Sequence, residues 1–212
     1  MKTVELIAAL AADTAPERID MRRRFGVALA AGGVLSLALF VALLGPRPDF
    51  MSAVGTVRFD LKFVNALALA FPALALLYRL RRPDARPGVL ALLLAAPFVL
   101  LAAGVVVELM VTPPGEWATR LVGRNMRYCV TAIPLMAAPI LVGLIVALRP
   151  GAPQRPGWTG ALAGAAAAGF AAFLYASHCT DDSPLFVATW YPLATVVCAA
   201  VGAWAGRRFL EW

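Results

Sequence analysis

Six long apolar runs, separated by short polar segments, set the pattern of this chain. Each contains about the 20 consecutive apolar residues that a helix needs to cross the hydrocarbon core of a bilayer. The runs cover residues 25–44, 61–80, 88–112, 129–148, 158–177 and 185–205. The pattern predicts an all-α polytopic membrane protein, with a six-helix transmembrane domain at residues 25–206 and a short tail at residues 207–212.

Small residues and prolines within the runs add detail to this bundle. Gly160 with Gly164, and Gly202 with Gly206, are pairs four residues apart, which suit a close crossing of two helices. We expect both pairs to pack within one chain. Prolines within the runs should bend their helices where neighbouring groups satisfy the freed carbonyls: they are Pro72, Pro97, Pro134, Pro139 and Pro192.

Basic residues flank the apolar runs unevenly. The chain is 61% hydrophobic with a net charge of +7. Because the charges lie beside membrane runs, we expect the lipid bilayer as a partner and no direct binding of nucleic acid. Thirteen Lys and Arg fall in the N-terminal segment, the loops after the second and fourth runs, and the tail, against six in the remaining loops. Cytoplasmic loops collect such residues, so we expect both termini in the cytoplasm.

The N-terminal segment, residues 1–24, is polar with one short amphipathic stretch. Leu6, Ile7 and Leu10 share one face at helical spacing, and Pro16 ends the run. A helix of about nine residues is marginal alone in water. We therefore expect this helix to use its apolar face to bind a partner.

A short polar gap between the last two runs concentrates reactive residue types. It holds the single histidine, His178, followed directly by Cys179. Cys129 begins the fourth run at the same outer depth, so the two thiols suit a disulfide or a shared soft-metal site; two unrelated thiols remain the alternative. Cys198 lies in the middle of the sixth run and is expected to be a small buried hydrophobe.

The acidic residues of this region allow two interpretations. Asp181 and Asp182 could join His178 and the thiols as candidate metal ligands. Alternatively, Asp182 or Ser183 serves as the N-cap of the sixth helix, with Pro184 in its first turn. Glu108, the only ionisable residue well inside a run, is another candidate ligand. A salt bridge from Glu108 to a nearby arginine is the other expectation, with three candidates: Arg120, Arg124 or Arg127.

Catalytic motifs are missing from the sequence. It contains no Gly-rich phosphate loop, no paired zinc histidines, no Ser/His/Asp set and no Cys-x-x-Cys. We expect no catalytic residues and no enzyme activity. A small transporter, for which Asn65 and Glu108 would supply a polar path, and a thiol–disulfide membrane protein remain as alternatives.

Several segments resemble the NrsF family of six-helix membrane-embedded anti-sigma factors. They are residues 178–186 (HCTDDSPLF), residues 189–192 (TWYP), the opening segment with Lys2, Thr3, Leu6, Ile7, Leu10 and Asp13, and a region containing Gly123, Arg124, Cys129 and Pro134.

The resemblance implies a function and a location. It implies a protein of the bacterial inner membrane whose cytoplasmic N-terminal segment holds an extracytoplasmic-function sigma factor. It also implies that Cys129 and Cys179, on the periplasmic side, respond to heavy-metal or oxidative stress. No resident cofactor is then expected, only a transiently bound heavy-metal ion. The oligomeric state stays open.

Overall fold

The computed structural model describes residues 3–12, 20–82, 85–151 and 153–211, and every regular element in this part of the chain is helical. Six stretches are long and apolar enough to cross a membrane, which confirms the predicted class. The long helices are α2 (Met21–Leu43), α4 (Val57–Leu80), α6 (Ala96–Val111), α8 (Met126–Leu148), α9 (Pro156–Ala176) and α10 (Pro184–Phe209). The shorter ones are α1 (Thr3–Ala12), α3 (Phe50–Ala53), α5 (Leu90–Leu93), the 3-10 turn η1 (Pro114–Glu116) and α7 (Trp117–Val122).

Two predicted boundaries need correction. The third run is not one helix, because α5 ends at Leu93 and α6 begins at Ala96. Pro97 lies in the first turn of α6, where its missing N–H costs no hydrogen bond, and does not bend a helix from within. The last helix extends to Phe209, so Arg207 and Arg208 form its final turn instead of a tail. Basic side chains are favourable there because they face the negative end of the helix dipole.

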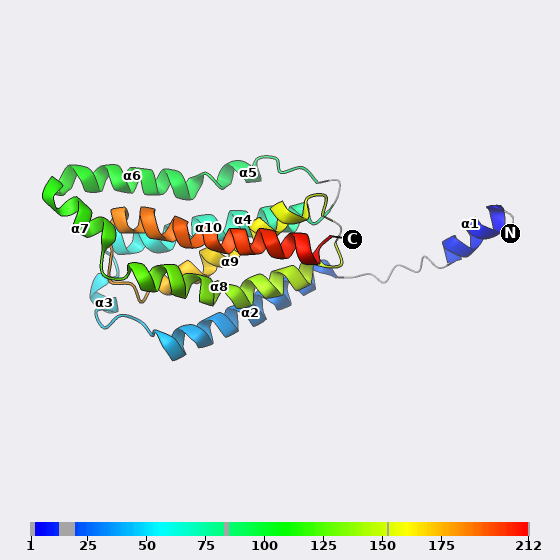
Figure 1. The fold of residues 1–212 in the computed structure, drawn as a ribbon, viewed down its shortest axis with the longest axis horizontal. Coiled ribbons are helices and arrows are strands. Elements are labelled where there is room, and N and C mark those ends of the chain that lie inside the picture. Colours follow the sequence, from blue (N-terminus) through cyan, green and yellow to red (C-terminus); the bar gives the residue numbers. More distant parts are fainter. Residues whose placement is uncertain (1–2, 13–19, 83–84, 152, 212) are drawn as a thin grey trace.

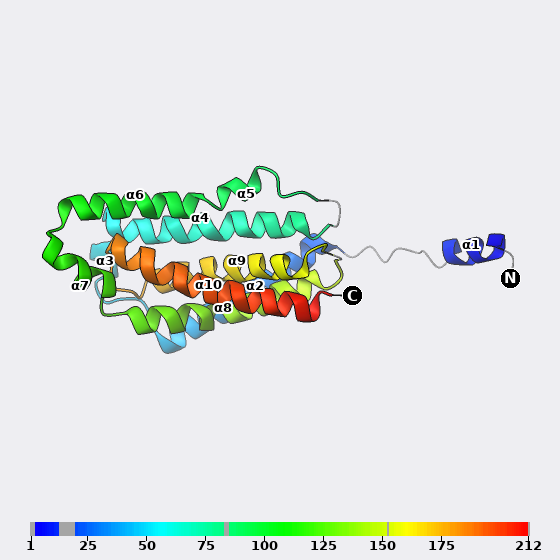
Figure 2. The same ribbon diagram turned by 45° about the horizontal axis from the view of Figure 1, so that its top comes forward.

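The six-helix bundle has two distinct ends (Figures 1 and 2). One end carries α3, α7 and the link from α9 to α10, and we call it the outer end. The start of α2 and the end of α10 lie at the opposite end, which we call the inner end. This arrangement follows from the six crossings, which return the chain to the side where it started.

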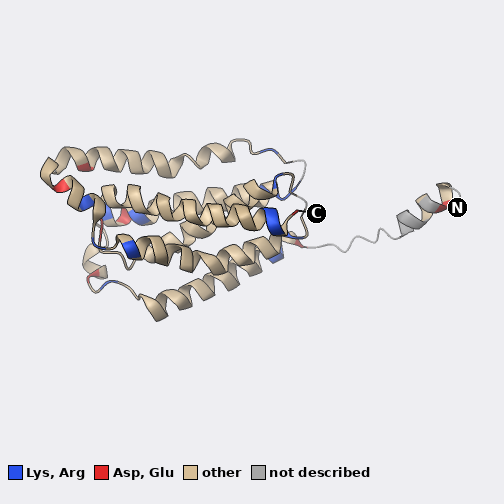
Figure 3. Ribbon diagram, viewed as in Figure 1, with Lys and Arg blue, Asp and Glu red and all other residues tan. Residues whose placement is uncertain are grey.

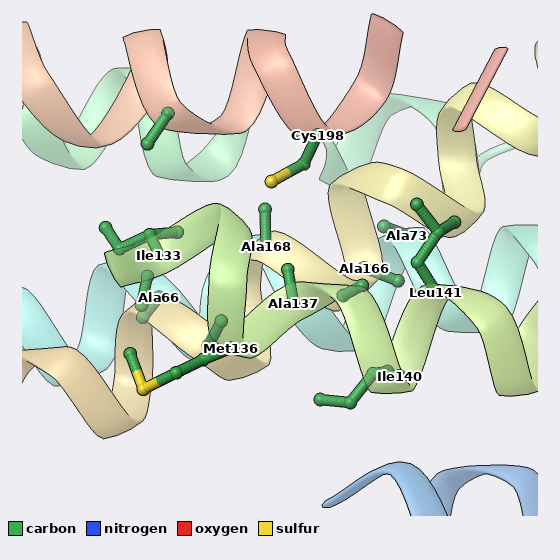
Figure 4. Close-up of a cluster of buried hydrophobic side chains, with 14 of the residues drawn as sticks. Ala66, Ala73, Ile133, Met136, Ala137, Ile140, Leu141, Ala166, Ala168 and Cys198 are labelled. Carbon is green, nitrogen blue, oxygen red and sulfur yellow. The ribbon is translucent and has the colours of Figure 1, made fainter. Parts of the chain in front are cut away.

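The core of the bundle is built around α9, whose buried face is almost entirely alanine and glycine. Helices α4, α8 and α10 all pack on it. Ala166 and Ala168 of α9 lie among Ile133 and Ala137 of α8 and Cys198 of α10 (Figure 4). Cys198 is buried, as predicted. Small side chains here allow the neighbouring backbones to come close.

The predicted glycine crossing is confirmed between α9 and α10. A Cβ on Gly160 would collide with the carbonyl oxygen of Gly202, and one on Gly164 with the carbonyl oxygen of Cys198. A Cβ on Gly206 would lie 2.9 Å from the Cα of Gly160. Both glycine pairs therefore serve packing within the chain, where no side chain fits between the two backbones.

Candidate functional site

The link between α9 and α10, residues 177–183, is folded back over the outer end of α9. The N–H groups of His178 and Cys179 both donate to the carbonyl oxygen of Tyr175, at 2.9 and 3.0 Å. The N–H of Arg47, in the loop after α2, donates to the carbonyl oxygen of Ser177. The backbone of the link is thus fixed both to its own helix and to a distant loop.

Cys129 and Cys179 are both fully buried free thiols in the same core cluster. Cys129 lies in the first turn of α8, and Cys179 lies in the link that follows α9. Burial raises the pKa of the Cys179 thiol to about 11, even though the ammonium of Lys62 acts in the opposite direction. At neutral pH this thiol is therefore protonated, whereas the thiolate is the form that binds metals and reacts with oxidants.

Asp182, which is half-buried, forms an ion-pair cluster with two buried cations far away in the sequence. Its carboxylate lies 2.6 Å from Nζ of Lys62 and 2.8 Å from Nη1 of Arg47. The same two cations donate to the carbonyl oxygen of Cys179, at 2.8 Å from Lys62 and 3.3 Å from Arg47. Two positive side chains thus hold both the carboxylate and the Cys179 backbone of the link.

Arg47 extends the cluster to a second acid. Its guanidinium also binds Asp49, at 2.6 Å. This hydrogen bond raises the pKa of Arg47 and lowers the pKa of the Asp49 carboxyl. Both groups are consequently charged across the physiological range, as an ion pair requires.

The capping interpretation holds for Ser183 and Pro184 but is wrong for Asp182. The Ser183 hydroxyl accepts the N–H of Leu185, and Pro184 occupies the first turn of α10, as predicted. Asp182 does not cap the helix, because its carboxylate turns toward Arg47 and Lys62. Both carboxylate oxygens are bound to these cations, and the cap of α10 falls to Ser183.

Asp181 links the Cys179 segment to the helix that carries Cys129. Its Oδ2 accepts the backbone N–H groups of Arg124 and Asn125, at 2.9 and 2.8 Å, and the side-chain amide of Asn125. These groups directly precede α8. A Cβ on Gly123, whose φ is +61°, would lie 2.8 Å from the carboxyl carbon of Asp181. Glycine is therefore needed for this close approach.

Glu108 lies at the centre of a second charged cluster at the outer end. Its side chain is 2% exposed and pairs with Arg58 and Arg120, each at 2.8 Å. The Ser183 hydroxyl also donates to Glu108, at 3.2 Å. Arg120, one of the three predicted partners, is confirmed, while Arg58 was not anticipated. Helices α4, α6 and α7 are thereby connected to the start of α10.

His178 is held by the loop that follows α2. Its Nδ1 lies 2.9 Å from the carbonyl oxygen of Gly45, and its ring stands 6.0 Å from the ring of Tyr175. Within the described part of the chain no three or more His, Cys, Asp or Glu residues are grouped to hold a metal. The larger predicted ligand set, with Asp181, Asp182 and Glu108, is not brought together here, because cations and backbone N–H groups occupy those carboxylates.

The basic partners at the outer end, Arg47, Arg58 and Lys62, were missed as site residues. The sequence could have indicated them, because each lies in or beside the outer end of one of the first two apolar runs. The acidic residues of the site are expected at the same depth. Figure 3 shows basic and acidic residues together at this end. All six salt bridges in the described residues belong to it.

The amphipathic N-terminal helix is present as α1, Thr3–Ala12. The apolar side chains of Val4 and Ile7 are 75% and 61% exposed. The side chains of Leu6 and Leu10, the other two residues of the predicted binding face, lie outside the described residues. An apolar helix face with exposed residues is thus placed ahead of the bundle in the chain.

Known proteins match the chain along its length. The profile of the NrsF family, described as negative regulator of sigma F, matches residues 10–212. The anti-sigma-F factor NrsF of Caulobacter vibrioides is 32% identical, and the probable anti-sigma-F factor NrsF of Azospira oryzae is 30% identical. Both alignments cover 100% of this chain and 100% of the relative. No solved structure matches the chain.

Proposed function

The chain belongs to the NrsF family, and on that premise we propose that it is a membrane-bound sensor that holds an extracytoplasmic-function sigma factor through α1. The sigma factor is released when Cys129 and Cys179 react with a heavy-metal ion or an oxidant. The observation that carries this proposal is the burial of two free thiols in one core cluster, at the end of the bundle opposite the start of α2.

The chemistry at the outer end follows from the state of the thiols. A soft metal ion prefers thiolate ligands, and binding it releases their protons. Because Cys129 and Cys179 are fully covered, a metal ion reaches them only when residues 177–183 move. Such a movement separates Asp182 from Lys62 and Arg47, so it is coupled to the loop after α2 and to the start of α4.

At the inner end, α1 supplies the surface for the sigma factor. Its apolar face would enter an apolar groove of the partner, as amphipathic helices do in other complexes. Movement of the outer ends of α8 and α10 would be passed along rigid, closely packed helices to the inner end. The bundle would have one arrangement that holds the sigma factor and one that releases it. If the metal ion binds the releasing arrangement more tightly by roughly 3–5 kcal/mol, most molecules would change to that arrangement.

The binding face of α1 can be tested with a substitution on each side of the helix. Ile7→Asp places a charge on the predicted apolar face, and we expect loss of the sigma factor that co-purifies with the full-length protein. Ala8→Asp changes the opposite face by the same charge and should leave co-purification intact. Equal retention of the sigma factor by both variants would show that α1 is not the binding element.

The sensor assignment can be tested with the three cysteines. Cys129→Ser and Cys179→Ser should each abolish induction of a sigma-dependent reporter by cadmium, because each removes one soft ligand. Cys198→Ser changes a buried thiol outside the outer end and serves as the matched control, with normal induction expected. If induction survives both Cys129→Ser and Cys179→Ser, the cysteine mechanism is wrong. That result would leave the proposed binding of the sigma factor to α1 unaffected.

A further inference from the structure

A cavity lies at the inner end of the bundle, between the end of α4, helix α5 and the start of α9. Its volume is about 500 Å³. The floor is apolar and includes Leu76, Leu80, Leu94 and Leu162. The rim is basic and contains Arg82, Arg86 and Arg155. A cavity with an apolar floor and a cationic rim suits an amphiphile with a negative headgroup.

The three rim arginines are the cationic side chains of this cavity. In the part of the chain that the structure describes, no acidic side chain lines this cavity, and no ion pair involves the rim arginines. Arg81, by contrast, donates to the carbonyl oxygen of Tyr78 and stacks on its ring at 3.9 Å, so it faces elsewhere. Arg155 also lines a neighbouring cavity that contains Glu211, so its charge is partly balanced from that side. Among the described residues that line the present cavity, the three arginines are the groups that can bind an anion.

The start of α9 adds to the positive potential at the same rim. Arg155 is the N-cap residue of this 21-residue helix, and Pro156 is in its first turn. The first N–H groups of a helix and its dipole favour a negative group at that end. Trp158, also in the lining, is 70% exposed, as is typical of side chains at the level of lipid headgroups.

We propose that this cavity binds an anionic phospholipid, with its phosphate among Arg82, Arg86 and Arg155 and an acyl chain along the leucine floor. Basic pockets between transmembrane helices bind such headgroups on the cytoplasmic side, which is the expected side of the inner end. A second groove, between α2 and α8, has a volume of about 690 Å³ and contains Arg23 and Arg24. Asp20 also lines it, so its rim attracts anions less.

The test compares lipid binding to the purified full-length protein by native mass spectrometry. Phosphatidylglycerol and phosphatidylcholine with identical acyl chains are titrated, and we expect retained phosphatidylglycerol at a clearly lower concentration. The triple variant Arg82→Gln, Arg86→Gln, Arg155→Gln should bind it at least about tenfold more weakly, since each arginine near an anionic headgroup adds on the order of fivefold. The control triple variant Arg22→Gln, Arg149→Gln, Arg208→Gln loses the same charge outside the cavity lining and should bind normally.

Two further measurements separate this site from general electrostatic attraction. Ala91→Trp fills the floor but keeps all three arginines, and it should also weaken binding of phosphatidylglycerol. Glycerol 1-phosphate, which has the headgroup chemistry without acyl chains, should not displace the lipid. The proposal is overturned by equal weakening in the control triple variant, by unchanged binding to Ala91→Trp, or by displacement with glycerol 1-phosphate.

Discussion

Lys62 is the residue whose environment constrains the outer end most. Its side chain is 0% exposed, and its ammonium pairs with two groups of the link, Asp182 at 2.6 Å and the carbonyl oxygen of Cys179 at 2.8 Å. It also lies over the ring of Phe59, 5.1 Å from its centre. Removing an ammonium from water costs several kcal/mol unless it is paired. The position of the Cys179 segment and the burial of Lys62 are therefore mutually dependent.

Asp182→Asn should expose this dependence. The substitution leaves Lys62 buried without its counter-charge, and we expect a loss of about 3–5 kcal/mol in unfolding free energy. Because the link then opens more often, alkylation of Cys179 by a water-soluble maleimide should become faster. Thermal unfolding of the purified protein and the rate of alkylation check both effects.

Asp49→Asn is the matched control for this prediction. Asp49 also pairs with Arg47, but its side chain is 53% exposed. Exposed ion pairs contribute about 0–1 kcal/mol, so stability and the alkylation rate should change little. If Asp49→Asn and Asp182→Asn behave alike, the buried pair with Lys62 does not hold the link.

At the residue scale, the sequence correctly predicted interactions between residues that are close to each other in the chain. Ser183 and Pro184 were assigned correctly because capping involves residues within one turn. The role of Asp182 was not predictable in this way, since Arg47 lies 135 positions away. Its partner is fixed only by the tertiary structure, in which the loop after α2 lies against the link between α9 and α10. Asp181 is similar, because it binds backbone N–H groups that precede a different helix.

At the element scale, the close crossing of α9 and α10 depends on glycines, which have no side chain. We expect Gly160→Ala to destabilise the protein by about 1–3 kcal/mol, because the added methyl meets the backbone of α10 and the helices must separate. Gly33→Ala in α2 adds the same group where nothing lies within 4 Å. That change should be neutral or stabilising by up to about 1 kcal/mol, since alanine favours the helix.

Thermal unfolding in detergent measures both glycine variants. A Gly160→Ala protein as stable as Gly33→Ala would mean that the two backbones are not in close contact. Because α10 begins directly after the Cys179 link, a looser crossing should also reduce the response of the reporter to cadmium.

Hydropathy predicted the six long elements because each needs enough apolar residues to cross a bilayer. It did not predict α3 and α7, which are short and carry mixed polar and apolar residues. It also merged α5 and α6, since the residues between them, Leu94 and Ala95, are as apolar as the helices themselves. Breaks of this kind are set by neighbouring packing and by Pro97.

At the scale of the whole molecule, the remaining prediction concerns orientation in the membrane. The excess of basic residues in the N-terminal segment, two loops and the end of α10 predicts that the inner end faces the cytoplasm of a bacterial inner membrane. Green fluorescent protein fused after Trp212 should be fluorescent, and alkaline phosphatase at the same place should be inactive. Alkaline phosphatase inserted at Gly55, in the loop after α3, should be active. The reverse pattern would contradict this orientation.

The charge balance of the outer end has a consequence for the energised membrane. The salt-bridge network there joins four basic side chains, Arg47, Arg58, Lys62 and Arg120, to four acidic ones, Asp49, Glu108, Glu116 and Asp182. One elementary charge moved across the membrane potential changes the energy by about 2.3 kcal/mol per 100 mV. A network with equal numbers of both signs carries no net gating charge when it moves as a unit. The proposed opening, however, separates Asp182 from Lys62 and Arg47. That step moves a carboxylate relative to its cations, so its energy would depend on the membrane potential in proportion to the distance the carboxylate travels along the membrane normal.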